Sequence, residues 1–465
     1  MRIVVLGGGP GGYAAAFEAA RLGAEVTLVE KERLGGTCLN WGCIPTKTIL
    51  RSAHIVHDTA HAAEFGLEVA GVATVDVDRL RARKEGVVDE LVGQIESMAK
   101  RLKVRVVYGE GRLASPREVE VQSADEQTER LEGDAVILAT GSVPTRLPAI
   151  DHDLPGVWTS DDAVSLGEIP GEIVIIGCGA IGLEFACAYA AFGSTVRLVE
   201  LMEQVLPGND RRVVKAVETA LKEMGVRFYL GNVVEAVEQV GDRVRATLRS
   251  GDILEADVVL SAPGRMPNSE GLGYPEAGIE MDRAAVKVDQ YFRTNVEGVY
   301  AIGDLIGGMM LAHVAEEEGV VAARNAVAEL KTVGAAPHLE SVRYDCIPAC
   351  VYTFPEVAIV GSSRDSAKER GVDAVQAVAK FAANGKALGE GEADGFVQMA
   401  AEKGTGRIVG AQIVGPHAVE IVHEVALAMA HGIGVRELAE TVHAHPTVSE
   451  VVKFAALDAA GKCGC

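Results

Sequence analysis

The sequence has a shortage of basic residues and few cysteines. Its 44 Lys and Arg residues stand against 66 Asp and Glu residues, which gives a formal net charge of -22. Nucleic acids and anionic membrane surfaces bind basic proteins, so the charge predicts neither as a partner. Eight cysteines are too few to staple 465 residues together. In a reducing compartment, closely spaced cysteines more often serve redox chemistry or metal binding.

Long hydrophobic runs are also missing. No apolar run reaches the roughly 18 residues of a membrane-spanning helix. The first residues, MRIVVLGGGP, enter a strand at once and carry no charged leader or cleavage site. We therefore expect a cytoplasmic protein. With 465 residues, 48% of them apolar, the chain suits a globular protein of about three domains.

One pattern of strand, glycine turn, small-residue helix and second strand occurs twice. Residues 3–30 read IVVLGGGPGGYAAAFEAARLGAEVTLVE, and residues 173–200 read IVIIGCGAIGLEFACAYAAFGSTVRLVE. Both copies share the spacing of three glycines and one acid: Gly7, Gly9, Gly12 and Glu30 in the first, and Gly177, Gly179, Gly182 and Glu200 in the second.

This spacing suits the binding of a dinucleotide. The first glycine permits a tight turn, the second lets the backbone approach a pyrophosphate, and the third lets helix and strand pack closely. The helix N-terminus favours the pyrophosphate, and the acid accepts hydrogen bonds from ribose hydroxyls. Two copies in full context predict two dinucleotide sites. Glu200 repels a 2′-phosphate, and the LMEQVLPGND that follows has no Arg or Lys, so we predict NAD rather than NADP at the second site.

Later segments complete the layout. Residues 134–144, 257–268 and 299–305 each run from an apolar strand into a glycine turn, as nucleotide-binding sheets do. The polar segment 123–134 is typical of a surface hairpin. Beyond residue 340 the pattern changes to several strands followed by two apolar helices, which predicts a separate α+β domain.

Two cysteines lie five residues apart in GGTCLNWGCIPTKTIL, residues 35–50. In a regular helix the rise from Cys38 to Cys43 would be about 7.5 Å, whereas a disulfide needs Cα atoms about 4.4 to 6.8 Å apart. A disulfide therefore requires a break in the helix, which Gly42 and Pro45 favour. Cys43 would then lie near a helix N-terminus, where the dipole stabilises a thiolate. Two buried unreactive thiols are the alternative. The spacing does not suit a zinc half-site, so we predict no metal site.

Two other residues suit thiol chemistry. Lys47 lies four residues past Cys43 on the same helical face, where a cation stabilises a thiolate or a reduced flavin; a solvated lysine is the alternative. His445 lies in HAHPTVSE, residues 443–450. An imidazole titrates in the right range for proton transfer, and Glu450 can fix its tautomer. A surface or helix-capping histidine is the alternative.

Nearly the whole chain resembles the pyridine nucleotide–disulfide oxidoreductase family. GGTCLNWGCIPTK with HAHPTVSE is similar to its dihydrolipoamide dehydrogenase branch, as are MLAHVAEEEG and YTFPEVAIVG. Glutathione-type reductases are less similar, because they carry basic residues for NADP where this chain has Glu200. The resemblance implies an α/β fold with two Rossmann-like nucleotide-binding domains, for FAD and NAD, and a C-terminal α+β dimerisation domain. It divides the chain into an FAD domain with the redox disulfide, an NAD domain, a segment completing the FAD site and an interface domain: residues 1–150, 151–275, 276–340 and 341–465.

The resemblance also implies roles for matching residues. Cys43 is the flavin-proximal thiol, Cys38 is the interchange thiol that attacks substrate, and Lys47 lies by the flavin and pairs with Glu184. His445 is the acid–base group, oriented by Glu450, and reaches the disulfide of the other subunit of a homodimer. The implied FAD site is Gly7, Gly9, Gly12, Glu30, Thr37, Lys47, Thr140, Gly141, Asp304 and Ala312. The implied NAD site is Gly177, Gly179, Ile181, Gly182, Glu200 and Gly264. The implied reaction oxidises dihydrolipoyl groups, on a lipoyl-bearing protein or as free lipoamide, with NAD⁺ through a Cys38–Cys43 disulfide.

The chain departs from that branch at its end, GKCGC. The position of Cys463 and Cys465 is similar to that of the C-terminal thiols of mercuric reductases and large thioredoxin reductases. Two interpretations stay open, a disordered unused tail and a redox or metal-passing site. Cys346 and Cys350 are also unusual, and we expect them in a strand and a loop near the interface.

Two other functions compete with the leading one. The first is an NADH-dependent reductase of another disulfide, a polysulfide or a thiophilic metal, acting through the C-terminal cysteines. The second is a non-catalytic binding protein on the same fold. The presence of both Cys38 and Cys43, with Lys47 and His445, argues against the second.

Overall fold

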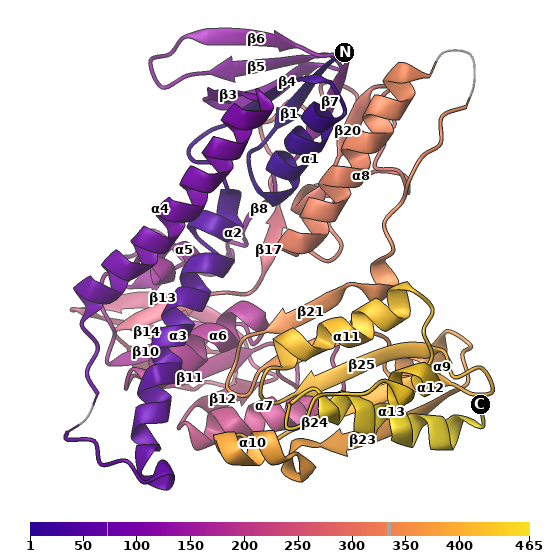
Figure 1. The fold of residues 1–465 in the computed structure, drawn as a ribbon. Helices are drawn as coiled ribbons and strands as arrows, with labels where there is room; N and C mark the ends of the chain where they lie inside the picture. The colour runs from indigo at the N-terminus through magenta and orange to yellow at the C-terminus, as the bar shows by residue number, and fades with distance from the viewer. Residues whose placement is uncertain (72, 333–335) are drawn as a thin grey trace.

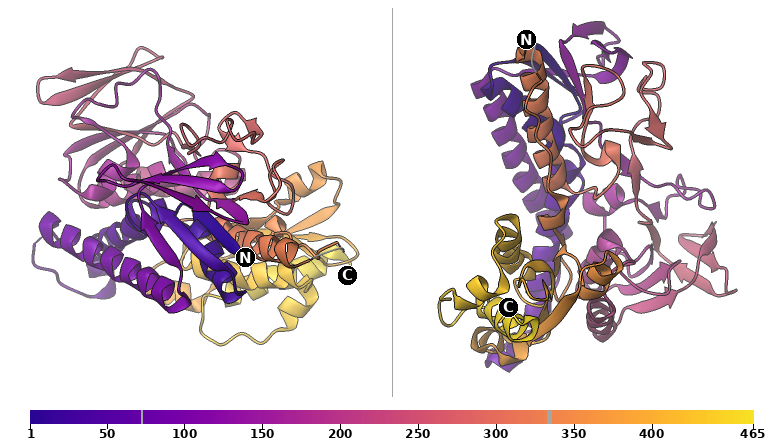
Figure 2. Two further views of the ribbon diagram at one scale, coloured as in Figure 1. Left: turned by 90° about the horizontal axis from the view of Figure 1, so that it is seen from above. Right: turned by 90° about the vertical axis from the view of Figure 1, so that its right-hand side faces the viewer.

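A computed structural model describes residues 1–71, 73–332 and 336–465. Residues 72 and 333–335, which fall within the expected segments 1–150 and 276–340, lie outside the described residues. Figure 1 shows two sheet-based units, one at the top and one behind, and a third unit built from the C-terminal residues at the lower right. Two further views separate the second unit from the C-terminal one (Figure 2).

The first unit is a parallel sheet in the order β20-β7-β1-β2-β3. Its strands are β1 (Arg2–Leu6), β2 (Glu25–Glu30), β3 (Arg105–Tyr108), β7 (Ala135–Leu138) and β20 (Val299–Ala301). Runs rich in Val, Ile and Leu form the central strands, as expected where helices cover both faces of a parallel sheet. Because β20 pairs with β7, the chain returns to the first sheet after building the second.

Helices α1 (Pro10–Arg21) and α8 (Ala312–Lys331) pack side by side on this sheet (Figure 1). Their backbones approach so closely that a Cβ on Gly319 would lie 2.3 Å from the carbonyl oxygen of Gly11. An antiparallel sheet of β4 (Glu110–Ser115), β5 (Glu118–Gln122) and β6 (Thr128–Glu132) extends from the same unit. The β5–β6 turn confirms the hairpin predicted at residues 123–134.

Three helices follow the first nucleotide motif: α2 (Gly36–Asn40), α3 (Cys43–Ala60) and α4 (Val77–Leu102), with a short helix η1 (Ala62–Phe65) after α3. The side chain of Asp76 caps α4 by accepting from the backbone N–H of Arg79 at 3.0 Å. The long helices α3 and α4 run from the first unit toward the other two (Figure 1). Helix α3 therefore reaches residues of all three units.

The second unit repeats the parallel design in the order β12-β11-β10-β16-β9. Its strands are β9 (Val157–Trp158), β10 (Glu172–Ile176), β11 (Thr195–Glu200), β12 (Arg227–Leu230) and β16 (Val258–Ser261). Its helices are α5 (Ser160–Ser165), α6 (Ala180–Ala191) and α7 (Arg211–Glu223). An antiparallel sheet of β13 (Val234–Val240), β14 (Arg243–Leu248) and β15 (Ile253–Ala256) packs on one face and shares an apolar core with β10 and β11.

Small elements join the two nucleotide-binding units. Strand β8 (Ser142–Pro144) pairs antiparallel with β17 (Arg265–Pro267), so a turn of the first unit meets a turn of the second. A two-stranded pair, β18 (Met281–Asp282) and β19 (Ala285–Val286), precedes the short helix η2 (Gly303–Ile306). Asp304 lies in η2, so this connection places it where the first and second units meet.

The C-terminal unit is an antiparallel sheet in the order β21-β22-β25-β24-β23. Its strands are β21 (Pro348–Val351), β22 (Val357–Gly361), β23 (Ala374–Lys380), β24 (Phe396–Glu402) and β25 (Ile408–Val414). Its helices are η3 (Tyr344–Cys346), α9 (Arg364–Glu369), η4 (Phe381–Ala383), α10 (Gly385–Glu390), α11 (Ala418–Ala430), α12 (Val435–Glu440) and α13 (Glu450–Cys463).

The predicted fold class is confirmed, because two parallel sheets and a separate α+β unit are present. Of the two apolar helices predicted near the end, α11 and α13 are the long ones, and the six-residue α12 between them was not predicted. The residue bounds proposed for the domains stay a prediction. Within the described ranges, no helix is both long and apolar enough to cross a membrane.

Candidate redox site

The first nucleotide motif has the geometry that its glycines predict. Gly7 follows β1 with φ +109°, and a Cβ there would lie 2.3 Å from the carbonyl oxygen of Ala139. A Cβ on Gly12 would lie 1.8 Å from the carbonyl oxygen of Gly7, so the helix can approach the strand only without a side chain. At the end of β2, the Glu30 carboxylate accepts from the backbone N–H of Gly8 at 2.9 Å.

The second motif repeats these contacts. Gly177 has φ +101°, and a Cβ on Gly182 would lie 2.0 Å from the carbonyl oxygen of Gly177. The Glu200 carboxylate accepts from the backbone N–H of Cys178 at 2.7 Å and from that of Met202 at 2.9 Å. Both acids are therefore fixed at the end of the second strand, where a ribose would lie.

The middle glycine of each motif shows that the turns suit a ligand. Gly9 and Gly179 cap α1 and α6 in ordinary extended conformations, with φ −72° and −76°. A Cβ on Gly179 would meet no protein atom within 4 Å, and one on Gly9 would come no closer than 3.6 Å. Protein packing therefore does not require glycine there, whereas a pyrophosphate at the helix N-terminus does. The residues present fit two dinucleotides.

Hydrogen bonds bring together several residues predicted for the FAD site. Arg265 donates to the hydroxyl of Ser142 at 2.8 Å and to that of Thr37 at 3.4 Å. Ser142 in turn donates to the Asp304 carboxylate at 2.5 Å. Thr140 donates to the carbonyl oxygen of Asn268 at 2.7 Å. Asp304 thus lies beside Thr37 across the β8–β17 connection, and Ser142 and Arg265, which link them, were not predicted.

The remaining predicted nucleotide residues occupy turns and helix starts. Gly141 and Gly264 have φ +71° and +140°, and a Cβ on either would meet nothing within 4 Å. Ile181 is the second residue of α6, and Ala312 is the first residue of α8. All four lie at the turns after β7 and β16 or at helix N-termini, as the nucleotide sites require.

The cysteine pair lies at a helix break, as predicted. Helix α2 ends at Asn40, Trp41 and Gly42 form the break, and Cys43 is the first residue of α3. Pro45 lies in the first turn of α3, where proline is tolerated. Both cysteines are half-buried and are not bonded to each other.

The two thiols have different acidities. A hydrogen bond from Cys38 lowers the pKa of Cys43 to about 7, although burial opposes this, and the Lys47 ammonium lowers it further. The same hydrogen bond, together with burial, raises the pKa of Cys38. Cys43 is therefore the thiol that ionises first, in agreement with its place at the N-terminus of α3.

Lys47 connects the cysteine helix to the second unit. Its ammonium pairs with the Glu184 carboxylate on α6 at 2.8 Å, and the Glu184 side chain is only 5% exposed. The other oxygen of Glu184 accepts from the backbone N–H of Tyr352 at 3.1 Å. The ammonium also lies 4.5 Å from the centroid of the Tyr352 ring. The pairing of Lys47 with Glu184 agrees with the resemblance, whereas Tyr352 was not predicted.

His445 and Glu450 form the expected pair. Nδ1 of His445 lies 3.0 Å from the Glu450 carboxylate, and the backbone N–H of Thr447 donates to the same carboxylate at 3.0 Å. The Thr447 hydrogen bond and the His445 contact lower the pKa of Glu450. With Nδ1 bound, Nε2 is the ring nitrogen that remains for proton transfer.

The His445 side chain is 78% exposed. Within the described ranges, no hydrogen bond or ion pair links it to Cys38 or Cys43. His443, two residues earlier, instead has a 6% exposed side chain and pairs with Glu424 at 2.7 Å. One chain therefore holds the cysteine pair and the histidine pair as two separate groups.

The C-terminal cysteines are ordered and bonded. Cys463 and Cys465 form a disulfide, and Cys463 is 4% exposed. The carbonyl oxygen of Cys463 accepts from the backbone N–H of Gly404 at 2.9 Å, and Arg436 donates to the carbonyl oxygen of Cys465. These contacts hold the tail on the C-terminal unit. Its redox role stays a prediction.

The other unusual cysteines are unpaired thiols. Cys346 ends η3 and donates to the carbonyl oxygen of Arg343 at 3.3 Å, and Cys350 lies in β21. Burial raises the pKa of Cys350 to about 11, so it is a poor nucleophile at neutral pH.

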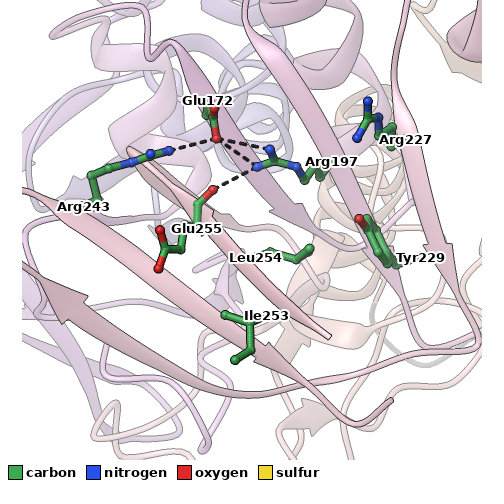
Figure 3. A pocket seen from close by; sticks show the side chains of 8 residues that line it. All are labelled: Glu172, Arg197, Arg227, Tyr229, Arg243, Ile253, Leu254 and Glu255. Atoms are coloured by element: carbon green, nitrogen blue, oxygen red, sulfur yellow. Dashed lines mark hydrogen bonds and ion pairs between the residues drawn. The ribbon is translucent and has the colours of Figure 1, made fainter. Parts of the chain in front are cut away.

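A polar pocket of about 530 Å³ lies elsewhere on the second unit (Figure 3). Glu172 accepts from Arg197 at 3.2 Å and from Arg243 at 2.8 Å, so these charges pair with one another. Glu172 begins β10 and Arg227 begins β12, which places the pocket at the amino ends of the strands. The nucleotide motif lies at the carboxyl ends, so this pocket is not the expected NAD site.

Two dinucleotide turns with a cysteine pair at their junction define the class of protein, an oxidoreductase that couples two nucleotides to a pair of thiols. Comparison with known proteins gives the family. Residues 1–319 match the pyridine nucleotide-disulphide oxidoreductase family, and residues 347–456 match the dimerisation domain of that family. The chain belongs to this family, whose cofactors are FAD and NAD(H), and the dimerisation domain supports a homodimer.

Several relatives are similar over almost their whole length. Leghemoglobin reductase from Vigna unguiculata is 42% identical, with 98% of this chain and 87% of that protein covered. Mitochondrial dihydrolipoyl dehydrogenase from Pisum sativum is 40% identical, with 98% and 90% covered. The crystal structure of LpdA from Mycobacterium tuberculosis superposes with a TM-score of 0.91 at 29% identity, covering 98% of this chain and 99% of that one.

Proposed function

We propose that this chain is a dihydrolipoyl dehydrogenase, which oxidises dihydrolipoyl groups with NAD⁺. The observation that carries the proposal is that one chain holds two groups of reactive residues. Cys38 and Cys43 lie beside the Lys47–Glu184 pair, and His445 and Glu450 form a separate pair. A dithiol substrate needs both a disulfide to exchange with and a base to ionise it. Relatives named dihydrolipoyl dehydrogenase, aligned over nearly the full chain, support the same activity.

The thiol exchange follows from the different acidities of the two cysteines. In the oxidised pair, a substrate thiolate attacks the sulfur of Cys38, and Cys43 leaves because its thiolate is the more stable one. The second substrate thiol then attacks the mixed disulfide, closes the lipoyl ring and releases Cys38 as a thiol. One dithiol becomes a disulfide while the enzyme disulfide becomes the Cys38 thiol and the Cys43 thiolate, so two electrons pass to the cysteine pair, one proton ends on Cys38 and the other on His445.

His445 takes the proton of each attacking thiol at Nε2. Glu450 holds the other ring nitrogen and stabilises the imidazolium that forms. Because the His445 side chain is exposed and separate from the cysteine pair of its own chain, we assign it to the cysteine pair of the partner in a homodimer. The dimerisation domain supports this assembly.

The cofactor sites adjoin the cysteine pair. Residues of the first motif, with Thr37 and Asp304, would hold FAD, and those of the second motif, with Glu200, would hold NAD. Bound FAD supplies two-electron transfer between the thiol pair and the nicotinamide. Lys47 places a positive charge beside Cys43 and keeps it ionised. A cytoplasmic location is part of the same proposal, since a redox-active thiol pair suits a reducing compartment.

A turnover assay tests the function. Purified protein with FAD should form NADH from dihydrolipoamide and NAD⁺, and NADP⁺ should be a poor substitute because Glu200 faces the 2′ position. Absence of NADH formation, with rapid NADH oxidation by polysulfide or another disulfide, would instead support a reductase that uses Cys463 and Cys465. The comparisons do not support that alternative better than the leading function.

A further inference from the structure

The ammonium of Lys47 has a contact that the proposed mechanism does not use. Its surroundings come from all three units: Cys43 precedes it on α3, Glu184 lies on α6, and Tyr352 follows β21. In Figure 1, β21 points from the C-terminal unit toward α3 and α6. We propose that Tyr352 is a positioning residue for Lys47, and that its ring holds the ammonium beside the cysteine pair. The C-terminal unit would then take part in the redox site of its own chain.

The contact geometry separates the ring of Tyr352 from its backbone. The backbone N–H donates to one oxygen of Glu184 at 3.1 Å, while the other oxygen accepts from Lys47 at 2.8 Å. Any side chain at position 352 keeps the backbone hydrogen bond. Substitution removes the ring, whose centroid lies 4.5 Å from the ammonium and which also packs against the apolar core of α3 and the second unit. A change at this position therefore tests the ring alone.

The residues that follow Tyr352 anchor its segment on α3. Phe354 packs on two histidines of α3, with ring centroids 4.8 Å from His54 and 5.8 Å from His57. The hydroxyl of Thr353 donates to the carbonyl oxygen of Pro355 at 2.7 Å. The segment after β21 thus follows α3 beyond Lys47, and this packing limits the movement of the neighbouring Tyr352.

The Tyr352 ring affects the pKa of Cys43 through the position of the Lys47 ammonium. Burial raises the pKa of Tyr352 to about 12, so its ring is neutral and presents a negative face to the cation at neutral pH. The Lys47 charge lowers the pKa of Cys43, and the Glu184 charge raises it. The position of the ammonium relative to the carboxylate therefore decides the net effect. Without the ring, the Lys47 ammonium would offset the charge of Glu184 less well, and the pKa of Cys43 would rise.

The experiment is a pH titration of the thiolate-to-flavin charge-transfer absorbance in the two-electron-reduced holoenzyme. Tyr352→Leu, which lacks the ring, should raise the midpoint by about half a unit to one unit. Tyr352→Phe keeps the ring and should leave the midpoint within about 0.2 units. In a Lys47→Met background, Tyr352→Leu should cause no further shift, because the two side chains act as one unit. FAD content and the thermal unfolding midpoint report whether each variant is folded.

Three results would overturn the proposal: no shift in Tyr352→Leu, an equal shift in Tyr352→Phe, or an undiminished shift in the Lys47→Met background. If Tyr352→Leu does not fold, Tyr352→Met fills the same space without a ring and must give the same upward shift. The inference rests on the Cys38–Cys43 pair being redox-active. Normal dithiol turnover with an unshifted midpoint would remove the role of Tyr352 and leave the proposed function intact.

Discussion

The cysteine pair and the histidine pair differ in how complete each is within one chain. Cys38 and Cys43 are half-buried at a helix break, and Lys47 beside them has partners from two other units. The His445 side chain is 78% exposed, and among the described residues its ring pairs with Glu450 alone. The electron-transfer half of the site is therefore built inside one chain, while the proton-transfer half points outward.

The C-terminal unit that carries His445 is also the one that matches the dimerisation domain. Several large apolar side chains on the same C-terminal unit are exposed: Leu427, Val442, Phe454 and Leu457, at 58%, 89%, 41% and 49%. Their exposure agrees with an interface on this unit, as expected for a dimerisation domain. On our proposal the dimer supplies chemistry as well as stability, and this can be tested from both halves of the site.

The largest effect should come from breaking the cysteine pair. Cys38→Ser or Cys43→Ser removes the disulfide that accepts the substrate electrons, so oxidation of dihydrolipoamide by NAD⁺ should fall by at least about 10⁴-fold. Steady-state NADH formation measures this. Cys346→Ser changes another half-buried free thiol and should stay within about twofold of the unaltered protein. Activity retained in Cys38→Ser would refute the exchange step.

Breaking the histidine pair should have the next largest effect. His445→Ala should lower dihydrolipoamide oxidation by about 10²- to 10⁴-fold, because the substrate thiol loses its base. Reduction of the flavin by NADH should be unaffected, since that half-reaction needs no proton transfer at the substrate thiol. His423→Ala, on the exposed face of α11, is the matched control. Equal loss in both half-reactions would indicate a structural defect instead.

Hybrid dimers sharpen the comparison directly. A dimer of one Cys38→Ser chain and one His445→Ala chain has one intact site if His445 serves the partner, and none if it serves its own chain. Random exchange of the two inactive proteins should therefore restore about a quarter of normal turnover. Co-expression with two different tags allows the hybrid to be isolated and assayed. An inactive hybrid would place His445 in its own chain's site.

A smaller effect concerns pH. The pKa of Cys43 is lowered from an ordinary value of 9.0 to about 7 in the folded protein. Between these values the folded protein holds a thiolate where an unfolded chain has a thiol. The charge-transfer absorbance of the reduced enzyme should thus be nearly constant above about pH 8, reach half its maximum near pH 7 and be lost below about pH 6. A midpoint near 9 would show that Lys47 and Cys38 do not stabilise the thiolate.

Sequence and structure agree best where function depends on local geometry. The turns at Gly7 and Gly177 and the helix break before Cys43 follow from residues close in sequence, so they were predictable. The pairing of Lys47 with Glu184 came only from the family resemblance, because the two residues lie 137 positions apart. Ser142, Arg265 and Tyr352 were missed because their partners lie in other units, and no periodic pattern marks such contacts.

The smallest effect is expected at the C-terminus. Cys463 and Cys465 are bonded to each other and packed against the β24–β25 turn, and Lys462 pairs with Asp458 at 2.6 Å rather than with a thiolate. Removing residues 463–465 should change dihydrolipoamide turnover by less than about twofold. A large loss with that substrate, in a variant of unchanged FAD content, would bring the tail into the reaction.

The most direct test of the central claim is an anaerobic absorbance titration of the FAD-bound protein with dihydrolipoamide, followed by NAD⁺. Our account predicts that a long-wavelength charge-transfer band appears as the cysteine pair is reduced, and that it disappears as NADH forms. A protein that NADH reduces but dihydrolipoamide does not would contradict the account and identify another disulfide, a polysulfide or a thiophilic metal as the acceptor.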